Sequence, residues 1–256
     1  WCLRWILPEI SARRCFLERW LKVEVMTTVE GERDGRIVVI NPNSSVAVTQ
    51  AMDSALDSLR FQGGPGIDCV TMSEGPPGIE TQEHVDAAVV PICQFVKDQA
   101  DCADAFVIAC FSDPGLSPAR EIAGVPVFGI AESAFAMALN YGQRFGVIAI
   151  LPASVIRQER YVTQLGLGQR YAASQAVGLG VTELEGPSSG ARLEAVGREL
   201  VETKGADVLI LGCAGMARHR ENIERALGVP VIDPAQAAAV QAIAAVRLKL
   251  TTRLTS

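Results

Sequence analysis

The chain has 256 residues, of which 49% are hydrophobic and 20% are charged, and its formal net charge is -6 at pH 7. This balance is typical of a soluble globular protein with a sizeable core, organised in one or two domains. The negative charge argues against a nucleic-acid partner, because phosphate binding needs a concentrated basic face, and no apolar run approaches the roughly 18 residues of a membrane span.

The first 34 residues differ in composition from the rest of the chain. They contain all three tryptophans, Trp1, Trp5 and Trp20, together with several arginines, and then become polar. No apolar core precedes a small-residue cleavage site, so a secretory signal peptide is not indicated. We expect residues 1–34 to be an extension outside the fold, with Met26 as the natural start. An amphipathic helix that docks on a partner is the alternative.

From Arg36 onward, short apolar runs alternate with longer segments of helical character, separated by Gly and Pro. The first run, 37–40, leads into the loop 41–45 (Asn-Pro-Asn-Ser-Ser), and another, 145–150, leads into Leu-Pro-Ala-Ser at 151–154. Continuous apolar runs suit parallel strands that helices cover on both faces. Covering helices are predicted over 45–60, 80–100, 133–141, 154–165, 191–204, 219–227 and 235–248.

Three landmarks recur in the same order in both halves of the chain. They are the Pro-containing loops after the first strands, the cysteines Cys110 and Cys213, and the Gly-Val-Pro-Val tetrapeptides at 124–127 and 228–231. Their spacing, about 105 residues, is too long for a solenoid repeat and matches a small α/β domain. We therefore predict an α/β fold of two pseudo-symmetric lobes, each a mainly parallel sheet flanked by helices. Residues 35–133 plus 234–256 would form lobe one, and residues 134–233 lobe two.

Cys110 ends one apolar run, and Cys213 ends the equivalent run in the second half. A single cysteine at a strand end is more often a small core residue, but the matched pair points to a site. Ligands of parallel sheets bind at the carboxyl ends of the strands, so the cleft between the lobes would hold both thiols. Racemisation next to a carbonyl needs a base on one face of the carbon and an acid on the other. A helix N-terminus would lower the thiol pKa and favour the thiolate.

Polar residues at the same strand ends are the predicted substrate contacts. Asn41, Ser44 and Ser45 follow the first strand, and Ser154 is their counterpart in the second half. Ser44 or Ser45 capping the next helix is an equally good interpretation, and it is compatible with substrate binding.

Other chemistries lack their motifs. The two histidines, His84 and His219, have no partners at ligand spacing and no Cys-x-x-Cys pair occurs, so no metal site is predicted. No complete Gly-x-Gly-x-x-Gly opens a helix after a strand. The segment 186–190 matches Gly-x-Ser-x-Gly, but no buried strand is predicted before it, so it is interpreted as a loop and helix cap. Seven cysteines in no secreted disulfide pattern favour the reducing cytoplasm.

Three motifs resemble the aspartate/glutamate racemase superfamily, and within it the hydantoin racemase branch, which includes allantoin racemases. The motifs are Ile40–Ser45, Ala109–Leu116 and Leu211–Met216. The resemblance implies a cofactor-independent, two-thiol racemase that forms a homo-oligomer and takes a small-molecule substrate. It makes Cys110 and Cys213 the acid/base pair. The residues that it implies for holding the substrate are Asn41, Ser45 and the backbone of Phe111, Ser112, Ala214 and Gly215.

The predicted function is racemisation of 5-substituted hydantoins or related cyclic ureides by proton transfer at the alpha carbon. Allantoin racemisation is the nearest alternative, followed by reactions like those of the superfamily's maleate isomerases and arylmalonate decarboxylases. Hydantoin racemases tend to have a threonine-rich stretch where this chain has Ala-Ile-Leu-Pro at 149–152, which leaves the substrate open. The alternative of another class is a non-catalytic protein that binds a small molecule.

Overall fold

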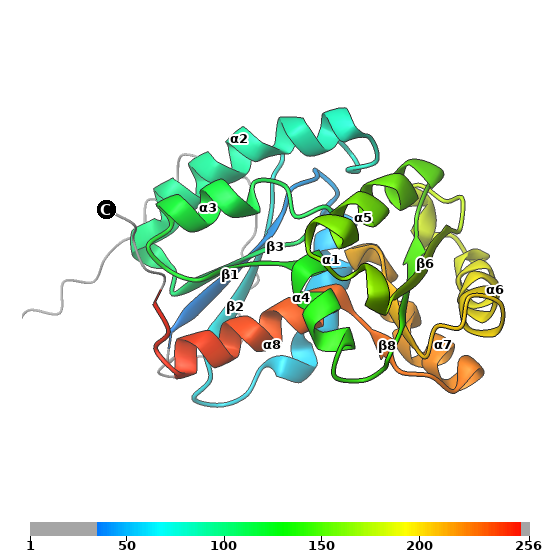
Figure 1. Ribbon diagram of the computed structural model, residues 1–256. Coiled ribbons are helices and arrows are strands. Elements are labelled where there is room, and N and C mark those ends of the chain that lie inside the picture. The colour runs from blue at the N-terminus through cyan, green and yellow to red at the C-terminus, as the bar shows by residue number, and fades with distance from the viewer. Residues whose placement is uncertain (1–34, 252–256) are drawn as a thin grey trace, which may run out of the picture.

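The computed structural model describes residues 35–251, which form two four-stranded sheets flanked by helices (Figure 1). The first half comprises β1 (Arg36–Asn41), α1 (Val46–Ala55), β2 (Gly66–Thr71), α2 (Gln82–Gln99), β3 (Ala105–Ile108), α3 (Leu116–Ile122), β4 (Val127–Gly129) and α4 (Ile130–Ala138). The second half comprises β5 (Phe145–Ala149), α5 (Pro152–Gln164), β6 (Tyr171–Ala176), α6 (Ser189–Glu202), β7 (Val208–Leu211), α7 (Arg220–Leu227), β8 (Val231–Ile232) and α8 (Pro234–Arg247). The predicted extension 1–34 lies outside the described residues.

The two sheets repeat one topology. Their strand orders are β2-β1-β3-β4 and β6-β5-β7-β8, and every paired strand is parallel. Each strand of the second order has a number four higher than its counterpart in the first, as expected for a duplicated lobe. The predicted two-lobed α/β fold is therefore confirmed, and β1 and β3 correspond to β5 and β7.

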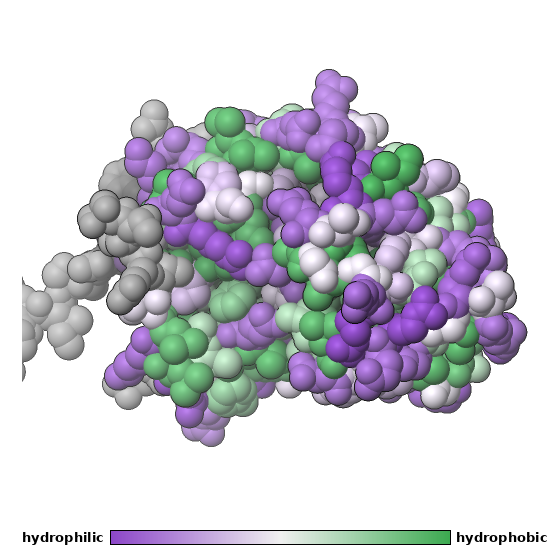
Figure 2. Space-filling view, viewed as in Figure 1, coloured by the Kyte–Doolittle hydropathy of each residue, from purple (hydrophilic) through white to green (hydrophobic). Residues whose placement is uncertain are grey.

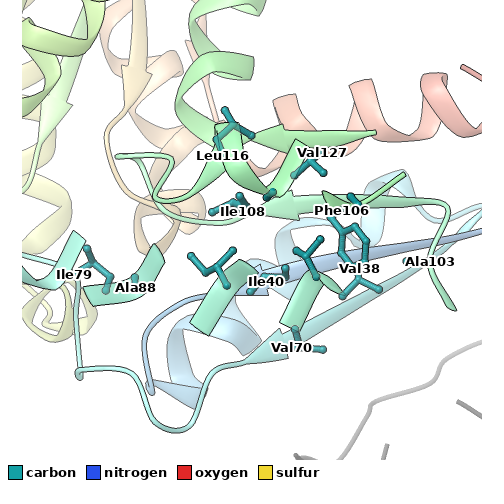
Figure 3. Packing of buried hydrophobic residues seen from close by; sticks show 14 of the residues in the cluster. Val38, Ile40, Val70, Ile79, Ala88, Ala103, Phe106, Ile108, Leu116 and Val127 are labelled. Carbon is teal, nitrogen blue, oxygen red and sulfur yellow. The ribbon is translucent and has the colours of Figure 1, made fainter. Parts of the chain in front are cut away.

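The first sheet is covered on both faces because its strands are apolar on both faces. Alternate residues of β1 and β3, among them Val38, Ile40 and Phe106, pack toward α2 and α3 (Figure 3). The intervening residues Ile37 and Val39 pack against α1 and α8. Helix α8 follows the second sheet in sequence but returns to the first one (Figure 1). Its contact face is a series of buried alanines, whose small side chains allow a helix to approach the strands closely.

The lobes are interlocked rather than merely adjacent. Helix α1 packs against the 3-10 helix Ala214–His219 (η6) of the second half, and α4 packs against β7, β8 and α8. Val48 of α1 belongs to the same core cluster as residues of β5 and β7. Because the two halves share a core cluster, the predicted lobe boundaries at residues 133/134 and 233/234 stay a prediction.

The strand order creates a crevice at the same place in both sheets. After β1 the chain passes to α1 on one face, and after β3 it passes to α3 on the other face. The chain after β5 and after β7 diverges in the same way, to α5 and α7. Adjacent parallel strands whose connections leave on opposite faces open a crevice at their carboxyl ends, where ligands of such sheets bind.

Several large hydrophobic side chains are exposed on the surface. Exposed examples include Phe61, Val90 and Tyr141, from distant parts of the chain, and Figure 2 shows hydrophobic groups interspersed with hydrophilic ones on the face in view. Within residues 35–251, no helix has the length and hydropathy of a bilayer span. The predicted homo-oligomer stays a prediction.

We expect Phe106→Ala to lower the free energy of unfolding by about 3–5 kcal/mol, because it empties a large volume in the core. Phe106 is fully buried on the central strand β3. Urea unfolding measures the change. Val90→Ala is the control, since Val90 is 74% exposed and surface truncations stay within about 0.5 kcal/mol. Similar losses for the two variants would contradict this account of the core.

Candidate active site

A cavity lies where the central strands of both sheets end. Asn43 follows β1, Cys110 follows β3, Ile150 follows β5 and Cys213 follows β7, and all four residues line the cavity. The crevices of the two sheets therefore open into one common site. The two cysteines are brought together from opposite lobes, as the sequence predicted, and both are free thiols.

Each cysteine is followed by a tight turn of the same kind. The Asp113 N–H donates to the Cys110 carbonyl at 2.9 Å, and the Met216 N–H donates to the Cys213 carbonyl at 3.1 Å. These turns direct the backbone N–H two residues after each cysteine back to its sulfur, so that Ser112 donates to Cys110 and Gly215 donates to Cys213. Each sulfur thus has a fixed donor that favours its anionic form.

The surroundings of the two sulfurs nonetheless disfavour the thiolate form. Burial raises the pKa of Cys110 to about 12 and that of Cys213 to about 11, against the opposing effect of the backbone donors. Asp113 adds to the rise in the pKa of Cys110, and Arg157 opposes it. The expected net lowering of the thiol pKa by a helix N-terminus is wrong. Cys110 lies before a turn, because α3 begins only at Leu116. Cys213 directly precedes η6, but desolvation of its sulfur outweighs the backbone donor there. Both thiols are therefore protonated at neutral pH.

The predicted polar residues after β1 hold the loop rather than line the cavity. Asn41 is fully buried, and its Nδ2 group donates to Asn43 Oδ1 and to Thr49 Oγ1, both at 3.0 Å. Ser45 caps α1 by accepting from the Val48 N–H, and the Ser44 N–H donates to the Pro76 carbonyl. The cavity-lining member of this loop is Asn43, which the sequence analysis missed.

The other predicted contacts mostly reach the cavity. Phe111, Ser112, Ala214 and Ser154 line it, while Gly215 contributes its N–H to the Cys213 sulfur.

Helix α5 adds two polar residues that the sequence analysis did not identify. Arg157 and Gln158 line the cavity although they are only 9% and 4% exposed. The Nη2 group of Arg157 donates to the Glu80 carbonyl at 2.9 Å and to Ser154 Oγ at 3.1 Å. Arg157 Nε and Gln158 Oε1 have no hydrogen-bond partner. An unused donor and an unused acceptor in a buried wall are groups that a ligand can satisfy.

A buried carboxylate fixes the turn that follows Cys110. Asp113 has a left-handed backbone (φ 44), and its side chain accepts from the N–H groups of Ala131 and Glu132 at 3.0 and 2.8 Å and from the Tyr161 hydroxyl at 3.0 Å. It thereby caps α4 and ties the turn to α5. A Cβ at Gly129 would lie 2.2 Å from the Asp113 carboxyl carbon, so this close approach requires glycine. Asp113 is a positioning residue for Cys110.

Two alternative chemistries find no support in the described part of the chain. Residues 35–251 contain no group of three or more His, Cys, Asp or Glu side chains that could hold a metal ion. The Gly-x-Ser-x-Gly segment follows the 3-10 helix Thr182–Glu185 (η5) and leads into α6. The segment is therefore not a nucleophile elbow after a strand. The predicted loop and helix cap is confirmed only in part, because Ser189 and Gly190 belong to α6 and its N-cap residue Ser188 makes no side-chain capping bond.

Comparison with known proteins identifies clear relatives. The family model of the Asp/Glu/hydantoin racemases matches residues 37–242. The chain is 36% identical over 201 residues to a hydantoin racemase of Pseudomonas sp. (strain NS671), covering 77% of this chain and 80% of that one. It is 38% identical over 207 residues to a hydantoin racemase of Rhizobium meliloti, with 79% and 85% covered. Among solved structures, an allantoin racemase from Klebsiella pneumoniae has a TM-score of 0.80 at 33% identity, covering 86% of this chain and 90% of that one.

We expect the thiols of Cys110 and Cys213 to titrate well above the ordinary value of about 8.5, because burial raises the pKa of both. A neutral group that must ionise in a buried site holds its proton to higher pH, so the thiolate signal should appear only in strongly alkaline solution. The difference in thiolate ultraviolet absorbance between the wild type and the Cys110→Ala/Cys213→Ala double variant measures it. A titration step of this difference near or below neutral pH would contradict the expectation.

We expect Asp113→Ala to destabilise the fold by at least about 1–3 kcal/mol, because it leaves buried N–H donors without an acceptor. Tyr161→Phe is the matched variant, since it removes one of the three donors to the same carboxylate and should cost less. Urea unfolding of both variants gives the comparison. Equal losses would show that the bonds to the α4 N-terminus do not matter.

Proposed function

This chain belongs to the Asp/Glu/hydantoin racemase family, and we propose that it racemises 5-substituted hydantoins or closely related cyclic ureides by a two-thiol mechanism. Membership of the family and the likeness to hydantoin racemases make it an isomerase. The substrate and the mechanism are our proposal. The observation that carries it is the pair of free thiols at equivalent strand ends of two lobes, lining one cavity.

In the proposed reaction the two sulfurs exchange roles. The Cys110 thiolate removes the alpha proton from one face, and the Cys213 thiol donates a proton to the opposite face. The electron pair released from the carbon–hydrogen bond spreads onto the adjacent carbonyl oxygen before reprotonation. The enzyme then has a Cys110 thiol and a Cys213 thiolate, which is the form that catalyses the reverse direction. The backbone donors Ser112 and Gly215 stabilise whichever sulfur is anionic.

Raised thiol pKa values fit the task of the base. A carbon acid next to a carbonyl is weak, and proton transfer is easier when the pKa of the base approaches that of the acid. A desolvated thiolate is a stronger base than one in water, so burial of Cys110 and Cys213 supplies basicity at the cost of a small thiolate population. A ligand that excludes water and brings its own donors would complete the site.

The remaining wall is largely apolar, with a few polar groups that can meet the amide edges of a cyclic ureide. Val48, Ile79, Ile150 and Val181 line the cavity from four different segments. Gln158 Oε1 is an unused acceptor, and a ring N–H of a cyclic ureide would satisfy it. The likeness to an allantoin racemase of known structure favours allantoin as the second substrate to test. Because both thiols must stay reduced, we propose a cytoplasmic location.

Proton NMR in deuterium oxide tests this function directly. Each enantiomer of a 5-substituted hydantoin, and allantoin, would be incubated with wild type, Cys110→Ala and Cys213→Ala, with uncatalysed exchange subtracted. We expect wild type to exchange the alpha proton and to abolish optical rotation. We expect both variants to lose racemisation by at least about 100-fold, since each removes one acid/base group. Each variant should still exchange the proton of the one enantiomer that faces the remaining thiol.

A matched control separates the thiols from general damage. Cys93→Ala removes a free cysteine of α2 that does not line the cavity, and it should leave racemisation unchanged. Wild type without exchange above background on every substrate would overturn the proposal, and ligand binding without exchange would favour a non-catalytic binding protein.

A further inference from the structure

Arg157 carries a buried charge that the described residues do not neutralise. Its side chain is held by two neutral acceptors, the Glu80 carbonyl and Ser154 Oγ, and its Nε group has no acceptor. None of the ion pairs among the described residues includes it. The next arginine on the helix, Arg160, is exposed and donates to Gln82 Oε1 at 2.7 Å. Arg157 is therefore unlike an ordinary surface arginine of an amphipathic helix.

Neighbouring carboxylates are engaged elsewhere. The Glu80 carboxylate accepts from the Val181 N–H at 2.8 Å, and Glu132 pairs with Arg120. Asp113 accepts three hydrogen bonds of its own. A guanidinium taken out of water without a counter-charge is costly, so an anion that pairs with it in the cavity would be stabilised.

Arg157 also stands between two cavities. It lines the thiol cavity, and together with Phe111 and Ser112 it lines a second cavity between α2 and α5. A ligand held between the thiols therefore lies next to Arg157, and a substituent of that ligand can contact the guanidinium. Nη2 already donates to two acceptors, so Nε and Nη1 are the donors that remain for a carboxylate on the ligand.

We propose that Arg157 is a specificity-determining residue that binds a carboxylate on the substrate's substituent, so that the preferred substrates are cyclic ureides with an acidic side chain. The inference rests on the proposed racemase function and narrows its substrate class. Arg157 could select an acidic substituent, or it could stabilise the negative charge that develops during the reaction, and these two roles predict different substrate preferences. An arginine that only stabilised the Cys110 thiolate or the carbanion would act on neutral and anionic substrates alike.

An isosteric pair of ligands tests the inference. 5-Carboxymethylhydantoin and 5-carbamoylmethylhydantoin differ by one charge and hardly in shape. Both kcat/KM for alpha-proton exchange and the dissociation constant by calorimetry would be measured for wild type, Arg157→Gln and Arg157→Lys. We expect wild type to prefer the carboxylate by about 10–100-fold, which is the range for a hydrogen bond to a charged group. Arg157→Gln should reduce the preference to about twofold or less, and Arg157→Lys should retain part of it.

The control variant is Arg198→Gln, which removes an exposed arginine of α6 and should retain the full preference. Equal affinity of wild type for the two ligands would overturn the inference, as would an equal loss on both ligands in Arg157→Gln. Exchange of neutral hydantoins without a carboxylate preference would overturn this inference and leave the racemase function standing.

Carboxylate binding that depends on Arg157, without exchange on any ligand, would support the anion site and overturn the racemase function. Absence of both binding and exchange would overturn both.

Discussion

Desolvation of two thiols at one point is the constraint on which the rest of the structure depends. A sulfur that must act as a base toward a carbon acid gains basicity when water is excluded. Exclusion of water also disfavours the thiolate, so the sulfur then needs hydrogen-bond donors that stabilise its anionic form. The structure meets this requirement twice, with a tight turn after Cys110 and another after Cys213 that each return a backbone N–H to the sulfur. Fixed donors cost no reorganisation when the sulfur becomes anionic.

The surrounding architecture serves to hold these turns. Two sheets of equal topology end at the same cavity, so duplication supplies two opposed faces of one site. Asp113 fixes the first turn by capping α4 and by accepting from Tyr161 of α5. Asn41 fixes the neighbouring loop by bonding to Asn43 and Thr49. Contacts between α1 and η6 keep the lobes in register, and small displacements of one lobe would separate the sulfurs from the substrate.

Local sequence patterns predicted the central strands and the two cysteines of this site, but not its remaining polar residues or the direction of the thiol pKa shifts. Continuous apolar runs marked the central strands, and the positions of Cys110 and Cys213 after them placed both thiols correctly. Helix α3 and strand β6 escaped prediction, because α3 is short and β6 is a half-buried edge strand rich in small and polar residues. The start of α4 was missed because its cap, Asp113, is distant in sequence. The inward orientation of Arg157 and the net rise in thiol pKa depend on burial by segments from the other lobe, which no local pattern reports.

The central claim is that two groups on opposite faces move the proton, and an optical-rotation time course in deuterium oxide tests it most directly. Starting from one protonated enantiomer of a 5-substituted hydantoin with slow uncatalysed racemisation, two thiols deliver deuterium to the opposite face. Removal of deuterium from the product is slower than removal of the proton from the substrate, so the product is converted back more slowly than it forms. The optical rotation should therefore pass through zero to the opposite sign before it decays. The residual substrate should remain protonated early in the course. A monotonic decay to zero, with the original proton retained in the first product, would contradict the account.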